Sequence, residues 1–151
     1  MNDIELTRAF ERGGIRNEDF HHASHVKVAW VYLSESRSIE EAAEKVSATI
    51  RRFAASAGKP EKYHETITQF WMRLLATLRD LMPGKNLTEI LEVNPRLLEK
   101  DFPLEYYSRD VLYSDQARMS WIEPDLRPLT DATSFRSSCP TCDPSYRVVR
   151  G

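Results

Sequence analysis

The sequence has almost no excess charge of either sign. Its 21 basic and 23 acidic side chains give a formal net charge of −2 over 151 residues. A chain that attracts nucleic acid through its overall field carries a clear basic excess. We therefore expect no nucleic-acid partner.

Long hydrophobic runs are also missing. No stretch approaches the 18 consecutive apolar residues that a membrane-spanning helix needs. The first fourteen residues are acidic and polar (MNDIELTRAFERGG), whereas a signal peptide is basic and then apolar. We expect no membrane association and a cytoplasmic location. An apolar fraction of 41% and a charged fraction of 29% are ordinary for one globular domain of this length.

Cysteine is scarce, with only Cys139 and Cys142 in the stretch CPTC. A C-x-x-C pair can be a redox motif where it opens a helix after a strand, but here Ser-Ser precedes it and Asp-Pro follows. It could form half of a zinc site, and the second pair that such a site needs is missing. We place this pair in a C-terminal tail over 131–151, after a single helical domain over 1–130.

The sequence shows no convincing strand pattern, because no segment alternates apolar and polar residues with a period of two. Helical periodicity predicts three long helices, over about 17–36, 38–57 and 60–82. Asn17, Ser38 and Pro60 suit the starts of these helices.

Shorter helices are expected after position 84, where prolines interrupt the pattern. The predicted fold class is all-α: a helical bundle of three long helices plus several short C-terminal helices. Short loops favour an up-down-up path for the long helices, which would place the first and third helix starts at the same end.

Histidine is rare, and its placement is uneven. Of the four histidines, three fall within FHHASH and the fourth lies in KYHETIT. The up-down-up path would gather all four at one end of the bundle. His22 and His25 are three residues apart and share a helix face, whereas His21 is expected to point elsewhere. His64 heads the apolar stripe of the third long helix.

A metal site is the leading interpretation of this cluster. Two imidazoles one turn apart, a third from a facing helix and a carboxylate form a suitable set of ligands for a divalent ion. We predict the ligands His22, His25, His64 and Glu65, with Glu61 as the second choice of carboxylate. Glu65 is also the predicted catalytic residue. The ion would be Fe, Zn or Mn, acting as a Lewis acid or, for iron, binding oxygen.

The leading functional hypothesis is thus a small metal-dependent enzyme that acts on a small-molecule substrate. Two alternatives stay open. In one, the chain is a non-catalytic helical binding or protein-interaction module whose histidines pack and cap. In the other, a neutral histidine acts as a general base without metal, oriented by Glu65. Further candidates are Asp101, Asp110 and Arg118 for contacts to the metal ligands or to a substrate, and Tyr106, Tyr107, Tyr113 and Trp121 for a pocket wall. We favour surface, capping and core-packing roles for all of them.

Three motifs carry a resemblance to a known family. They are F-x-H-x-x-H-V-x-x-A-W over 20–30, Y-H-E-T over 63–66, and a stretch over 112–126 with Ala-Arg, Trp and Pro-Asp-Leu. Together they resemble an uncharacterised family of small bacterial helical proteins. The resemblance implies that His22, not His21, is the motif histidine. It also implies an acidic residue where this chain has Ser24, and it brings no activity with it.

Overall fold

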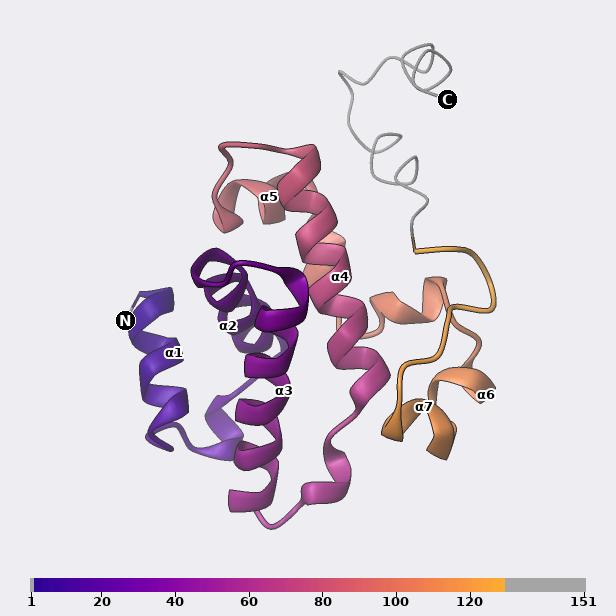
Figure 1. Ribbon diagram of the computed structural model, residues 1–151, viewed down its shortest axis with the longest axis horizontal. Helices are drawn as coiled ribbons and strands as arrows, with labels where there is room; N and C mark the ends of the chain where they lie inside the picture. The colour runs from indigo at the N-terminus through magenta and orange to yellow at the C-terminus, as the bar shows by residue number, and fades with distance from the viewer. Residues whose placement is uncertain (1, 130–151) are drawn as a thin grey trace.

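The computed structural model describes residues 2–129, apart from the side chain of Asn17. These residues form seven α-helices and four short 3₁₀ helices, and they contain no strand (Figure 1). The all-α prediction is confirmed. The predicted tail over 131–151, with Cys139 and Cys142, lies outside the described residues.

Three long helices form the centre of the fold. They are α2 (His22–Glu35), α3 (Ile39–Ser56) and α4 (Glu65–Leu81), and each packs against the other two. The Ser38 hydroxyl caps α3 by accepting the N–H of Glu41 at 3.1 Å, as its sequence pattern predicts. Gly58 follows α3 with a φ of +76°, a left-handed conformation that glycine adopts without steric cost.

An additional helix, α1 (Asp3–Glu11), precedes these three. The sequence reading assigned no helix to this polar segment, and the structure corrects it. The Asn2 side chain accepts the N–H of Glu5 at 2.8 Å, which is a helix cap. The Phe10 ring stacks on Phe20, with ring centroids 4.2 Å apart, and so fixes α1 to the core.

Helix α4 contributes to two apolar clusters. Its Met72 and Leu75 join a cluster with α1, α2 and α3, while its Phe70 and Leu74 join a cluster with the C-terminal elements. Those elements are α5 (Leu87–Val93), α6 (Arg109–Leu112), α7 (Asp115–Met119) and the 3₁₀ helices Pro95–Leu98 and Phe102–Glu105. In Figure 1, α4 accordingly lies between α3 and the pair α6 and α7.

Two predicted helix starts are wrong. The residues Asn17–Asp19 form a separate 3₁₀ turn, so α2 begins at His22. The residues Pro60–Lys62 form another 3₁₀ turn, and α4 begins only at Glu65. In both places a single 3₁₀ turn and two non-helical residues precede the α-helix. As a result His64 is the N-cap residue of α4 and not a residue within its first turn.

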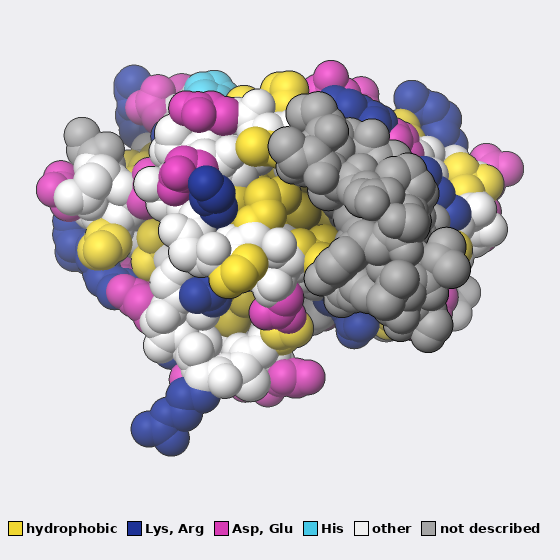
Figure 2. Space-filling view, turned by 90° about the horizontal axis from the view of Figure 1, so that it is seen from above, with side chains coloured by type: hydrophobic (Ala, Val, Ile, Leu, Met, Phe, Trp, Pro, Cys, Tyr) yellow, Lys and Arg dark blue, Asp and Glu magenta, His cyan; other side chains and the backbone are white. Residues whose placement is uncertain are grey.

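One face of the molecule carries charges of both signs. Basic and acidic side chains alternate over the face seen in Figure 2, with no large area of one sign outside the grey residues. No helix within 2–129 combines the length and hydrophobicity needed to cross a membrane.

Candidate functional site

One cavity contains the three histidines that the sequence singles out. It has a volume of about 460 Å³ and lies between the first turns of α2, the second half of α3 and the start of α4. His22, His25 and His64 all line it. The other lining residues are Val26, Ala29, Val46, Ile50, Lys62, Tyr63, Ile67, Thr68, Trp71, Met72, Lys100, Asp101 and Tyr113.

The His64 ring is fully engaged by backbone groups. Its Nδ1 accepts the N–H of Ile67 at 3.1 Å and so caps α4. Its Nε2 donates to the carbonyl oxygen of Leu112 at 2.7 Å. Nδ1 must therefore be unprotonated and Nε2 protonated, which defines a neutral ring. Burial lowers the pKa of His64 and stabilises that neutral form, with the nearby Arg118 charge adding a smaller effect.

The His22 ring has one nitrogen engaged. Its Nε2 donates to the carbonyl oxygen of Leu97 at 3.0 Å, which links the start of α2 to the 3₁₀ helix Pro95–Leu98. Its ring also lies against Trp71, with centroids 4.7 Å apart. Burial lowers the pKa of His22. His22 therefore joins α2, α4 and the C-terminal elements.

His25 differs from the other two histidines. Neither of its ring nitrogens forms a hydrogen bond with any residue within 2–129. An edge-on contact with Phe20, at a centroid distance of 4.4 Å, holds the ring in place. Burial, together with repulsion from His22, lowers the pKa of His25 to about 4, so the ring is neutral at pH 7. The His25 ring therefore offers one hydrogen-bond donor and one acceptor to the cavity.

The structure does not bring Glu65 into this cavity. The Glu65 carboxylate accepts from the Tyr63 hydroxyl at 2.5 Å and from the Gln69 amide at 3.0 Å, and lies 3.5 Å from Arg51. Glu65, Arg51 and Gln69 line a separate groove between α3 and α4, whereas Tyr63 lines the histidine cavity. Glu65 therefore stabilises the junction between α3 and α4.

The other predicted carboxylate is also outside, since Glu61 is exposed and does not line the cavity. His21 is exposed too, as the N-cap residue of α2, where the Ser24 hydroxyl accepts its N–H. Within 2–129, no group of three or more His, Cys, Asp or Glu side chains is placed to hold a metal ion. The ligand set His22, His25, His64 and Glu65 does not fit a metal, because His64 has no free lone pair and Glu65 lies in another groove.

The exposed side of the cavity carries three charged residues, of which the sequence analysis named only Asp101 as a candidate. Lys62 precedes α4 and Lys100 follows the 3₁₀ helix Pro95–Leu98, and both line the cavity with exposed side chains. Asp101 and Tyr113 are exposed there as well. No local sequence signal marks the two lysines, because only the packing of the C-terminal elements against α4 brings Lys100 to this place.

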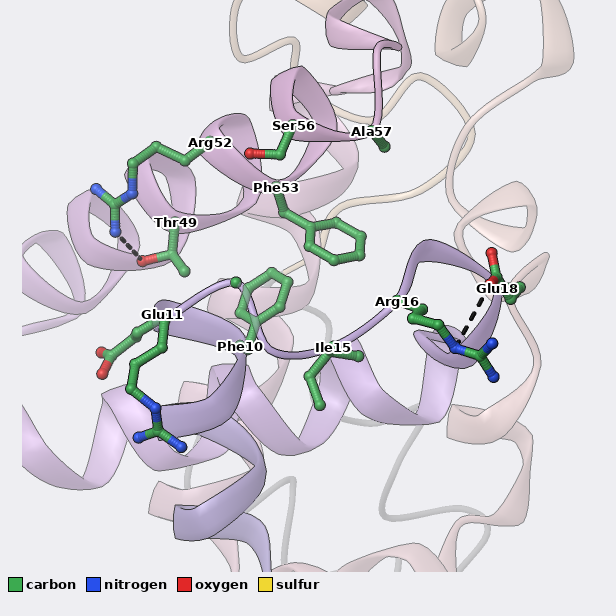
Figure 3. A pocket seen from close by; sticks show the side chains of 12 residues that line it. Phe10, Glu11, Ile15, Arg16, Glu18, Thr49, Arg52, Phe53, Ser56 and Ala57 are labelled. Atoms are coloured by element: carbon green, nitrogen blue, oxygen red, sulfur yellow. Dashed lines mark hydrogen bonds and ion pairs between the residues drawn. The ribbon is translucent and has the colours of Figure 1, made fainter.

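A second cavity, of about 520 Å³, lies between the end of α1 and α3. Figure 3 shows the Phe10 and Phe53 rings next to each other in its wall, with centroids 4.8 Å apart. Its polar side chains are largely paired locally: Arg16 lies 3.5 Å from Glu18, and Arg52 donates to the Thr49 hydroxyl at 3.4 Å. We therefore regard the histidine cavity as the stronger candidate site.

No protein-family model, curated protein or solved structure matches the chain. The resemblance noted from its motifs therefore stays an expectation.

Proposed function

We propose that the chain is a non-catalytic helical binding module that takes a small organic molecule into the histidine cavity without a metal ion. The observation that carries this proposal is the unpaired imidazole of His25 in the wall of a 460 Å³ cavity. The ring is partly exposed in the cavity wall, so a ligand that supplies the partner exchanges a hydrogen bond to water for one to the ligand while its apolar body leaves water.

The size and lining of the cavity support a small organic ligand. Pockets for such ligands have volumes of roughly 300–1,000 Å³, mostly apolar walls and a few polar groups that fix the orientation of the ligand. Here Trp71 and Met72 provide buried apolar wall, and Ile67 and Ile50 add partly buried surface. His25 provides the polar group.

Binding accounts for this histidine better than acid–base catalysis does. A general base is most effective when its pKa lies near the working pH. Burial holds the pKa of His25 at about 4, so the ring takes up a proton poorly at pH 7. As a neutral imidazole it can donate one hydrogen bond and accept another.

A fragment screen tests the proposal. The full chain at pH 7 is mixed with small aromatic and branched aliphatic compounds, and binding is detected by ligand-observed NMR. The blocking variant is Ile67→Trp, which places a large side chain in the cavity from a half-buried position. Thr68→Trp is the second blocking variant. The matched control is Ser56→Trp, an exposed position that lines the second cavity instead.

We expect fragments that bind the wild type and the Ser56→Trp variant and lose binding in both blocking variants. Circular dichroism checks that each variant folds. The proposal fails when no fragment binds the wild type, or when folded Ile67→Trp and Thr68→Trp chains bind the same fragments as tightly as the wild type does.

A further inference from the structure

The charges at the mouth of the histidine cavity indicate the class of ligand. Resting on the proposed function, we infer that the ligand is an amphipathic carboxylate, with an apolar or aromatic body inside the cavity and its carboxylate at the mouth near Lys62 and Lys100.

The mouth has charge available for such a group. Lys62, Lys100 and Asp101 line the cavity with exposed side chains. Within 2–129 none of these three side chains forms an ion pair or a hydrogen bond. Two free ammonium groups against one free carboxylate leave a net positive mouth, which favours an anionic ligand group over a cationic one.

The apolar interior of the cavity disfavours the ligand's charged group. Val26, Trp71 and Met72 are buried apolar wall, and an ionised group there would lose its hydration without a counter-ion. His25 can satisfy one neutral polar atom, such as a hydroxyl or a carbonyl oxygen, on the ligand body. The ligand therefore enters with its apolar body first and leaves its carboxylate at the lysines.

Trp71 favours a flat body in particular. Its side chain is only 7% exposed, and its ring contacts the rings of His22 and Phe102 at centroid distances of 4.7 and 6.0 Å. This packing holds the indole in one orientation, so that its cavity-facing surface is preformed. A preformed aromatic surface binds an aromatic body with little cost in side-chain ordering.

Matched probes separate the effect of charge from the effect of the apolar body. We choose 3-phenylpropanoate, 3-phenylpropanamide and 3-phenylpropylamine, which share one body and differ in the charge of the end group. A branched aliphatic pair, 4-methylpentanoate and its amide, repeats the comparison. Dissociation constants are measured by NMR titration at pH 7 and low salt, and again at high salt, where exposed charges are screened.

Charge variants locate the effect at the mouth. Lys62→Gln and Lys100→Gln should each weaken binding of the carboxylate by roughly two- to fivefold, as expected for exposed charge pairs, and leave binding of the amide unchanged. Asp101→Asn should strengthen carboxylate binding by roughly twofold. The matched control is Lys59→Gln, an exposed lysine three residues before Lys62 that does not line the cavity.

The inference predicts that the carboxylate binds more tightly than the amide and the amide more tightly than the amine. It is overturned when the amide or the amine binds as tightly as the carboxylate, or when Lys59→Gln weakens the carboxylate as much as Lys62→Gln does. It is also overturned when none of these probes binds while other fragments do. In these cases the proposed function stands, whereas an empty fragment screen rejects the proposed function itself.

Discussion

Acidification should destabilise the folded chain through His25. The pKa of His25 is about 4 in the folded chain and about 6.5 in an unfolded one. Between these values the unfolded chain binds a proton that the folded chain does not bind. The stability that His25 contributes is therefore complete above about pH 6.5 and falls as the pH drops towards 4.

The size of the loss follows from the same two values. One pKa unit corresponds to about 1.4 kcal/mol, and lowering the pH from 7 to 4.5 crosses most of the window. We expect His25 to account for about 2 kcal/mol of lost unfolding free energy over that interval. This is a large part of the roughly 5–15 kcal/mol by which native domains are stable.

The assay is urea denaturation of the full chain at pH 7 and at pH 4.5, followed by circular dichroism. Carboxylates and the other histidines also titrate in this range, so the change is compared with that of His25→Gln, which keeps a polar side chain that cannot be protonated. His25→Gln should lose about 2 kcal/mol less than the wild type between the two pH values. The matched control is His21→Gln, which replaces an exposed histidine outside the cavity. Equal losses in wild type and His25→Gln would refute the reasoning.

Three further predictions concern the cap of α4, a hydroxyl between α1, α2 and α3, and the metal content of the chain. His64→Ala removes the cap of α4 and should cost roughly 0.5–2 kcal/mol in unfolding free energy by urea denaturation, whereas His64→Asn should recover part of it because asparagine also caps helices. Tyr32→Phe removes a hydroxyl that lies 3.1 Å from the Thr49 hydroxyl and donates to Glu11, and should lower the unfolding free energy by about 1 kcal/mol in the same assay. A chain with Cys139 and Cys142 replaced by serine, expressed with added Fe, Zn and Mn, should purify with far less than one metal ion per chain by elemental analysis, and a stoichiometric ion lost in His22→Ala would restore the metal hypothesis.

The all-α fold could be predicted because its signals are local. Ser38 and Ser114 each cap the helix that directly follows them in the chain. Each hydroxyl accepts the N–H of the residue three positions later, so the contact is local. Helix α1 shows the same kind of signal in Asn2 and Glu5, but the polar composition of this segment did not indicate a helix.

The sequence also predicted which histidines share a face of the helix. His22 and His25 do line one cavity with His64, and His21 lies outside it. Their hydrogen bonds could not be predicted in the same way. The carbonyl groups that engage His22 and His64 belong to Leu97 and Leu112, which are 75 and 48 residues away along the chain.

The metal interpretation required Glu65 to face the same cavity as His64, and the sequence alone could not test this. Its neighbour His64 is the N-cap, so Glu65 starts the helix and turns toward Tyr63 and Arg51. Glu65 directly follows His64 along the chain, and successive residues at a helix start point in directions about 100° apart, so the two side chains enter different grooves. The lysines at the cavity mouth have no periodic signal at all.

The central claim is that a small organic molecule binds against His25 while His64 keeps its structural hydrogen bonds. The most direct measurement is a long-range ¹H–¹⁵N NMR spectrum of the imidazole rings at pH 7, recorded during titration with the tightest fragment from the screen. The claim predicts that the ¹⁵N chemical shifts of the His25 ring change as the ligand saturates the cavity. It also predicts that His64 remains protonated on Nε2 and unprotonated on Nδ1. Ring nitrogens of His25 that stay unchanged at saturation would contradict it.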